Sequence, residues 1–214
     1  MIRPATEADL QAILDIYNDA VINTTAVYTY TPHTLDMRRQ WFNEHREAGL
    51  PVFVLEEDGV IAGFATYGNF RPWPAYKYSI EHSIYVHKDF RRRHIATRLM
   101  EKLLEAANGA GYATMIAGID ADNAASIRMH ERFGFTFAGK IVKAGYKFGR
   151  WLDLVFYQKL LDGPKQPGGE CEKNKLERGR GTFLTKGSPP PLQTSPPPLQ
   201  RLSTLSNPHC RFSP

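Results

Sequence analysis

Three groups of polar side chains in this sequence have the types and spacing that chemistry needs. The stretch 80–87 alternates as a strand does, so Glu81, Ser83 and Tyr85 share one face. A carboxylate and a phenol that project together suit a cleft, where the carboxylate could accept a proton. A glutamate in a strand can equally be held in a salt bridge, and the residues alone leave both interpretations open.

A second group lies on a short predicted helix at 123–133. Asn123, Ser126 and His130 follow one another at i, i+3 and i+7, which places them along one polar edge. A histidine titrates near neutral pH, so His130 could donate or relay a proton. Alternatively, His130 only packs and hydrogen-bonds in the cleft, and Asn123 serves as the N-cap of its helix.

The third group is a run of arginines in the stretch RRRHIATRLM at residues 91–100. Ile95, Leu99 and Leu103 recur every four residues and predict an amphipathic helix. The three arginines at 91–93 therefore stand at the positive end of a helix dipole, where each cation costs about 0.3–1 kcal/mol. A bound phosphate would turn them into ligands. A solvated basic turn is the alternative.

Two aromatic-rich segments could bind a small molecule. The segment 68–78 reads GNFRPWPAYKY, and residues 28–30 read YTY. Prolines stiffen the first segment, and Arg71 offers a planar fork for a carboxylate. Tyr28 and Tyr76 would supply apolar walls. An arginine that merely covers the edge of the domain is the other interpretation.

Alternating helices and strands over residues 1–162 must position these groups. The patterns predict an α/β or α+β fold, with helices on a mixed sheet. The predicted helices cover 6–21, 34–48, 95 onward and 123–133, and the predicted strands cover 2–3, 51–55, 60–67, 77–87, 112–119, 135–142 and 151–158.

Residues 163–214 differ in character from the rest. They hold ten of the fifteen prolines, and the string SPPPLQ occurs twice. Such a composition cannot bury enough apolar surface to fold, so we expect a disordered tail. It is either an extension without function or a proline-rich ligand for SH3- or WW-like modules.

The net charge of +5 also comes from this tail. It holds eight of the 27 basic and three of the 22 acidic residues, which leaves residues 1–162 neutral with 19 of each. A nucleic-acid partner is therefore not expected, unless the basic tail alone binds it. Both cysteines, Cys171 and Cys210, lie in the tail as well, so the folded part has no thiol nucleophile.

Location and metal content follow from what the patterns lack. No stretch approaches the ~20 apolar residues of a membrane span, and the first residues contain no apolar signal core. We therefore expect a cytoplasmic protein without a membrane partner. The histidines show no metal-ligand spacing, and no metal is expected.

As a set, the motifs resemble the GNAT superfamily of N-acetyltransferases over essentially all of 1–162. The stretch 81–86 is similar to its Glu-x-Ser-Ile/Val-Tyr-Val motif, and residues 91–96 to its Arg-x-x-Gly-x-Gly/Ala loop, with His94 in place of the first glycine. The strings GIDADNAASIRMHERFGF at 118–135 and GYKFGRWLDLVFYQ at 145–158 resemble the phosphinothricin and methionine sulfoximine or sulfone acetyltransferase branch.

This resemblance implies a GNAT fold with a mixed, mostly antiparallel sheet of about seven strands, flanked by about four helices. It implies acetyl-CoA as co-substrate, with Glu81 as general base and His130 serving the departing sulfur. The implied acetyl-CoA contacts are the backbone of Ile84, Tyr85 and Val86, the pyrophosphate loop of Arg91, Arg92, Arg93, His94, Ile95, Ala96 and Thr97, and Asn123. The His94 side chain either hydrogen-bonds a phosphate or crowds it.

The implied acceptor is the α-amine of a small amino acid analogue, acetylated directly in a ternary complex. Its binding residues would be Tyr28, Arg71, Pro74, Ala75, Tyr76 and Tyr85. Acetylation of protein amines and acetyl-CoA binding without turnover remain alternatives. Relatives in this branch are commonly dimers, so we expect a homodimer.

Overall fold

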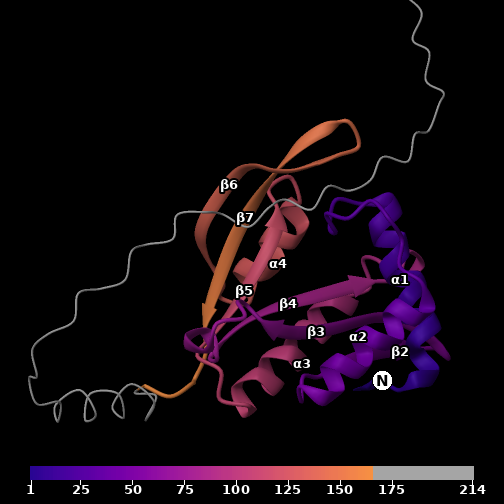
Figure 1. Cartoon of the computed structure of the whole chain (residues 1–214), viewed down its shortest axis with the longest axis horizontal. Helices are drawn as coiled ribbons and strands as arrows, with labels where there is room; N and C mark the ends of the chain where they lie inside the picture. Colours follow the sequence, from indigo (N-terminus) through magenta and orange to yellow (C-terminus); the bar gives the residue numbers. More distant parts are fainter. Residues whose placement is uncertain (166–214) are drawn as a thin grey trace, which may run out of the picture. The chain divides into compact units, whose positions relative to one another are not determined.

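Seven strands form one mixed sheet in the order β1-β2-β3-β4-β5-β7-β6, in which only β4 and β5 run parallel. The structure is a computed structural model that describes residues 1–165. The strands are β1 Ile2–Pro4, β2 Val52–Glu57, β3 Val60–Asn69, β4 Ser79–Val86, β5 Thr114–Asp120, β6 Thr136–Lys147 and β7 Arg150–Leu160. The helices are α1 Leu10–Asn23, α2 Leu35–Glu47, α3 Ile95–Gly109 and α4 Ala124–Arg132. The predicted sheet and its four helices are confirmed (Figure 1). The predicted tail lies, apart from its first three residues, outside the described residues.

Each face of the sheet has its own hydrophobic core, because successive strand residues point to opposite sides. In β2, Val52 and Val54 pack under α1 and α2, in the cluster that contains Phe64 of β3. Phe53 and Leu55 pack on the other face, in the cluster that α3 and residues of α4 complete. The sheet therefore keeps the side chains of one face apart from those of the other.

The first predicted helix begins later than expected. Thr6 and Asp9 form the predicted capping box, but it opens the short 3₁₀ turn Glu7–Asp9. The α-helix starts at Leu10, and it continues to Asn23. The cap at Thr34 is as predicted, since its hydroxyl accepts a hydrogen bond from the backbone N–H of Met37 at 3.3 Å.

The last two strands form a longer hairpin than the sequence indicated. β6 extends to Lys147 instead of ending at 142, and two register shifts interrupt its pairing with β7. These irregularities break the alternation on which the prediction depended. The two-residue turn has positive φ at both Phe148 (51°) and Gly149 (74°), which matches the twist of a tight hairpin.

Candidate active site

The two central parallel strands separate partway along their length. Ser79–Glu81 of β4 pair with Thr114–Ile116 of β5, whereas β5 continues to Asp120 paired only with β7. In Figure 1, β3 and β4 cross the view while β6 and β7 rise steeply away from them. Within the described part of the chain, the edge of β4 from residue 82 to 86 that faces β5 has no strand partner. Its free backbone groups can take up an extended ligand as an added strand.

Glu81 lies where the two strands begin to part. Its side chain is half-buried, and this burial raises the pKa of its carboxyl, an effect that the positive charge of Arg71 partly opposes. Glu81 forms no ion pair within residues 1–165. The salt bridge that the sequence left open for this residue is therefore not formed there. A carboxylate with a raised pKa is a stronger base at neutral pH.

The Glu81 carboxylate is accommodated by a glycine on β5. A Cβ atom at Gly118 would lie 3.0 Å from Oε1 of Glu81, closer than nine in ten real contacts. Only a residue without a side chain leaves the carboxylate where it is. Nothing in the sequence singles out Gly118, because one glycine inside a strand carries no signal of what lies opposite it.

Protein carboxylates neutralise two of the three arginines at 91–93. Arg91 pairs with Asp19 of α1 at 2.9 Å, and Arg93 pairs with Glu57 of β2 at 3.1 Å. Arg92 forms no ion pair with any residue that the structure describes. The cost of cations at this helix end is therefore offset in part by the protein itself, and not only by a ligand as the sequence suggested.

The helix start behind these arginines presents free backbone donors. The first intrahelical bond of α3 runs from the N–H of Arg98 to the carbonyl of His94, so the N–H groups of Ile95, Ala96 and Thr97 have no helical acceptor. Arg92 and His94 both have left-handed backbones, with φ of 64° and 58°. Glycine is favoured at such positions, so His94 is strained where the family motif has a glycine.

The polar edge predicted on α4 is divided between two roles. The side-chain oxygen of Asn123 accepts a hydrogen bond from the Ser126 N–H at 3.1 Å, which is the N-cap role. His130 is buried, with 3% of its surface exposed, and its Nε2 lies 3.0 Å from Nε2 of His82. His82 adjoins Glu81 in β4 and points to the opposite face. The structure therefore brings His130 to His82 and not to Glu81.

Hydrogen bonding assigns the protons of this histidine pair. Nδ1 of His130 is 2.7 Å from the Ser126 carbonyl, which can only accept, so His130 carries its proton on Nδ1. Nε2 of His82 must then donate to Nε2 of His130, and Nδ1 of His82 is left buried without a partner. Burial lowers the pKa of both rings, that of His82 to about 3, so both are neutral. No pattern in the sequence singles out His82.

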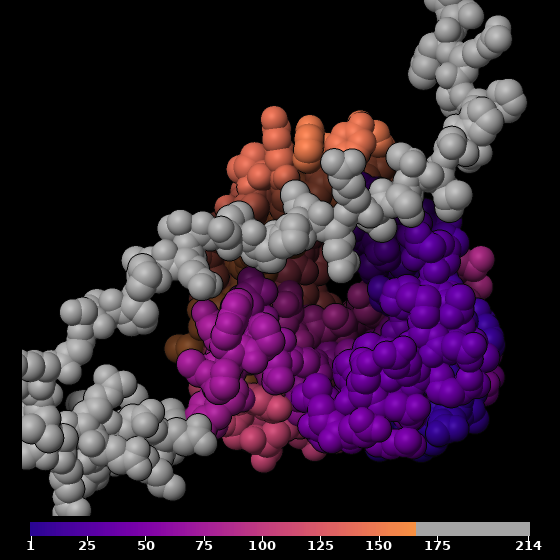
Figure 2. Space-filling model, in the orientation of Figure 1, coloured from indigo at the N-terminus to yellow at the C-terminus, as the bar shows by residue number. Residues whose placement is uncertain are grey.

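The segment 68–78 forms an exposed aromatic group near Glu81. Arg71 stacks on Phe70 with 4.3 Å between the guanidinium and the ring centre, and it forms no ion pair with a described residue. Trp73 and Tyr76 pack against each other, and Pro74 and Ala75 begin the turn between them. Figure 2 shows the surface hollowed between the violet region of α2 and the magenta region near residues 70–80.

The other predicted acceptor residues, Tyr28 and Tyr85, belong to other elements. Tyr85 is partly buried, with its ring stacked on Phe64 at 5.1 Å and edge-on to Tyr17, so packing occupies much of its surface. Tyr28 lies against the β6–β7 hairpin, where its ring covers Gly145. These two residues and Arg71 therefore come from three different parts of the domain.

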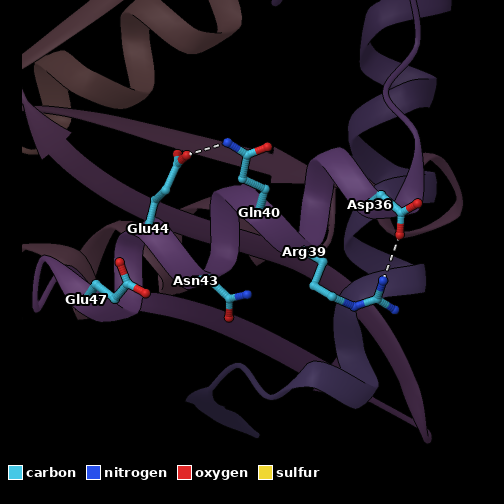
Figure 3. A pocket seen from close by; sticks show the side chains of 6 residues that line it. All are labelled: Asp36, Arg39, Gln40, Asn43, Glu44 and Glu47. Carbon is cyan, nitrogen blue, oxygen red and sulfur yellow. Dashed lines mark hydrogen bonds and ion pairs between the residues drawn. The ribbon is translucent and has the colours of Figure 1, made fainter.

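A depression of about 420 Å³ lies apart from this constellation, on the exposed face of α2. Figure 3 shows that its polar side chains pair along the helix, Arg39 with Asp36 and Gln40 with Glu44. Pairs of this spacing belong to a solvated helix surface. We assign it no role in the chemistry.

The described residues contain no group of three or more histidine, cysteine, aspartate or glutamate side chains able to hold a metal ion. In the same part of the chain, no helix combines the length and the apolar character that a membrane crossing requires.

Comparisons with known proteins agree with this geometry. Residues 10–135 match the description "Acetyltransferase (GNAT) family". A relative from Pseudomonas aeruginosa, called L-methionine sulfoximine/L-methionine sulfone acetyltransferase, is 44% identical over 162 residues, which are 75% of this chain and 94% of the relative.

Two solved structures have the same fold. One is a putative acetyltransferase from Salmonella typhimurium with its cofactor acetyl-CoA, 40% identical, with a TM-score of 0.76 over 78% of this chain and 97% of that one. The other is a phosphinothricin acetyltransferase from Sinorhizobium meliloti in complex with acetyl-CoA, 34% identical, with a TM-score of 0.76 over 79% and 93% of the two chains. The predicted family is confirmed: the chain belongs to the GNAT family of acetyltransferases.

Proposed function

We propose that this enzyme transfers the acetyl group of acetyl-CoA to the α-amine of a small amino acid analogue of the methionine sulfoximine, methionine sulfone or phosphinothricin type. The observation that carries the proposal is the position of Glu81, a carboxylate of raised pKa where β4 leaves β5, with the unpaired cation of Arg71 nearby. An α-amino acid offers an amine to the first group and a carboxylate to the second.

The proposed reaction is a direct transfer in a ternary complex. Glu81, directly or through a water molecule, accepts a proton from the substrate ammonium, and the freed nitrogen attacks the thioester carbonyl carbon. The nitrogen then loses its second proton, the carbon–sulfur bond breaks, and the thiolate takes up a proton, so that one proton in all is released. Free N–H groups on the open edge of β4, within Ile84–Val86, would hydrogen-bond the carbonyl oxygen as negative charge develops on it. Residues 1–162 contain no cysteine that could carry the acetyl group.

His130 is proposed to serve the departing sulfur, with His82 as its partner. Both rings are neutral, so a ring that gives its N–H proton to the sulfur would have to take up another proton at the same time. On this proposal, His130→Gln lowers kcat and leaves acetyl-CoA affinity unchanged. A variant with unaltered kcat would limit His130 to packing.

The residues present fit acetyl-CoA. The open edge of β4 matches an extended pantetheine arm, and the free N–H groups of Ile95, Ala96 and Thr97 match a diphosphate. Of the three arginines at 91–93, Arg92 is the one that pairs with no carboxylate of the described chain, so its charge is free to bind a diphosphate. Arg91, Arg93 and Asn123 would join it by exchanging or sharing their present partners.

For the acceptor, we propose that Arg71 binds the carboxylate. Tyr28, Pro74, Ala75, Tyr76 and the edge of Tyr85 would form the surrounding walls. Because Arg71 forms no ion pair with a described residue, its guanidinium can bind a carboxylate without first breaking an ion pair.

A thiol-release assay of the full chain, over a panel of amino acid analogues and peptides, tests this function. We expect turnover with the small analogues and a loss of kcat in Glu81→Gln. Glu101→Gln, on the exposed side of α3, is the matched control and should keep its activity. Calorimetric binding of acetyl-CoA without turnover of any acceptor would overturn the proposal, and turnover of peptides alone would favour the protein-acetylating alternative.

We also propose that two copies associate and act in the cytoplasm, where acetyl-CoA is made available to such enzymes. The β6–β7 hairpin leaves a group of large apolar side chains more than 48% exposed, namely Phe137, Ile141, Val142, Tyr146, Phe148 and Trp151. Such a group is unusual on a monomer and suits a second copy of the chain. Light scattering should give twice the mass of one chain, and Trp151→Glu should give the single mass.

A further inference from the structure

One buried lysine binds backbone carbonyls of a distant segment. Nζ of Lys147, at the end of β6, donates to the carbonyl oxygens of Val21 at 2.6 Å, Thr24 at 2.8 Å and Val27 at 2.7 Å. The residue is 5% exposed and forms no ion pair with any described carboxylate. All three protons of the ammonium are therefore used to bind one stretch of backbone.

This stretch is the end of α1 and the loop that follows it. Val21 belongs to the last turn of α1, whose carbonyls lack helical partners and carry the negative end of the dipole. Lys147 supplies the cation that such an end prefers. Its bonds to Thr24 and Val27 then determine the path of the chain toward Tyr28.

The two residues before Lys147 hold the same loop. A Cβ at Gly145 would lie 2.7 Å and 2.9 Å from two ring atoms of Tyr28, so the ring is packed directly on the glycine backbone. The hydroxyl of Tyr30 donates to the carbonyl of Tyr146. Three consecutive hairpin residues thus fix residues 21–30.

The loop stands near the open end of the cleft. The hydroxyl of Tyr28 donates to the backbone carbonyl of Asp153 at 3.5 Å, and the next residue, Leu154, pairs with Asp120, so the Tyr28 ring lies close to the last residue of β5. Gly118, over which the Glu81 carboxylate lies, is two residues earlier in that strand, or about 7 Å. Tyr28 is therefore within reach of a molecule whose amine is bound at Glu81.

We propose that Lys147 is a positioning residue for the acceptor site, and that it holds Tyr28 as the wall that restricts the acceptor to a small amino acid. The inference rests on the proposed function, whose acceptor it concerns. It assigns the lysine no contact with the reacting atoms. Its charge acts through the loop.

The test compares Lys147→Met with Lys147→Arg, and uses Lys140→Met as the matched control. Lys140 is on the same strand, where it pairs with Asp153 at the surface. In Lys147→Met we expect the KM of the small acceptor to rise about tenfold, while the Kd of acetyl-CoA changes less than twofold. The kcat/KM for larger amino acids should rise relative to the kcat/KM for small ones. Lys147→Arg keeps a donor for the carbonyls and should recover part of the loss.

A second pair of variants covers the case in which Lys147→Met fails to fold. Gly145→Ala forces Tyr28 from its place, whereas Gly139→Ala, on the same strand, has nothing within 4 Å of the added methyl group. Only the first should raise the acceptor KM. An unchanged acceptor KM in folded Lys147→Met and in Gly145→Ala would overturn the inference, as would an equal loss of acceptor and acetyl-CoA binding.

Hydrogen exchange separates this result from the proposed function. Amides of residues 24–30 should exchange faster in Lys147→Met than in the wild type, with no change in α3. An inactive wild type would overturn the proposed function and the acceptor role of Lys147 together. Unchanged exchange, beside an active wild type, would overturn the inference alone.

Discussion

The carboxylate of Glu81 lies against the backbone of Gly118, where the first missing side-chain atom of the glycine would be 3.0 Å from Oε1. The contact joins the last paired residue of β4 to a residue of β5 that lies two positions beyond the pairing. The carboxylate of the proposed base occupies the space that a side chain would fill at this glycine. The position of the base therefore depends on a residue of another strand.

Gly118→Ala should therefore impair catalysis more than folding. The added methyl group pushes the carboxylate away, and a displaced base costs about ten- to a hundredfold in kcat/KM. The measurement is steady-state kinetics beside thermal unfolding. Gly139→Ala serves as the control because its methyl group meets no other atom within 4 Å. Equal activity in the two variants would show that the base tolerates movement.

The pH dependence of the reaction should report Glu81. Burial raises its pKa above the ordinary value of 4.5, and the base must be ionised to act. The kcat/KM should consequently fall as the pH drops through this raised pKa. The profile should lose that limb in Glu81→Gln, measured on its residual activity. A limb that persists in Glu81→Gln would assign it to another group.

The same substitution should stabilise the fold at neutral pH. A carboxyl whose pKa is raised by folding contributes most to the stability of the fold below pH 4.5, where it is protonated in both the folded and the unfolded state. That contribution is lost as the pH rises through the folded-state pKa, because the buried charge is then penalised. Glu81→Gln removes the penalty, so its melting temperature should exceed that of the wild type at pH 7 and not at pH 4. A lower melting temperature at pH 7 would contradict this reasoning.

The buried histidine pair should make the fold sensitive to acid. The pKa of His82 falls from 6.5 to about 3 on folding, so below pH 6.5 the unfolded chain binds a proton that the folded chain does not. Stability is full above pH 6.5, and each pH unit below it costs about 1.4 kcal/mol for this proton until the folded-state pKa is reached. Urea unfolding at pH 7.5 and 5.5 should show a smaller difference in His82→Gln than in the wild type. Equal pH 7.5-to-5.5 differences in the two proteins would mean that His82 takes up a proton in the fold as it does in the unfolded chain.

His94→Gly should stabilise the start of α3. A left-handed backbone costs a non-glycine residue about 1 kcal/mol, part of which the greater freedom of glycine in the unfolded chain cancels. We expect the free energy of unfolding to rise by about 0.5 kcal/mol. His94→Ala keeps the strain and should bring no gain, and a stabilised alanine variant would contradict the explanation. Calorimetry of acetyl-CoA binding to wild type and His94→Gly would show whether the His94 side chain hydrogen-bonds a phosphate or crowds it.

Several parts of the site could be read from local sequence. Alternation over two-residue steps placed Glu81, Ser83 and Tyr85 on one face of a strand, because a strand has no other way to orient neighbours. The four-residue spacing of Ile95, Leu99 and Leu103 predicted α3, and all three residues are buried. These properties depend only on the geometry of a single element.

The partners of these groups could not be read in the same way. Asp19 and Glu57 are far from the arginine loop in the sequence but pair with it in the fold. A ligand therefore has less positive charge to neutralise than the sequence alone indicated. His82 meets His130 across 48 residues. The longer β6 was missed because its register shifts interrupt the alternation.

The sequence by itself determined the family, the seven-stranded architecture and which face of β4 carries the carboxylate, since these follow from motifs and from periodicities of single elements. Only the tertiary structure decided what each group meets. The separation of β4 from β5, the glycine beneath Glu81, the neutral histidine pair and the three carbonyls around Lys147 all depend on backbone brought together from far apart. Every residue has a backbone carbonyl, and a glycine looks the same in the sequence whatever lies opposite it in the fold, so no local pattern indicates where these groups will be used.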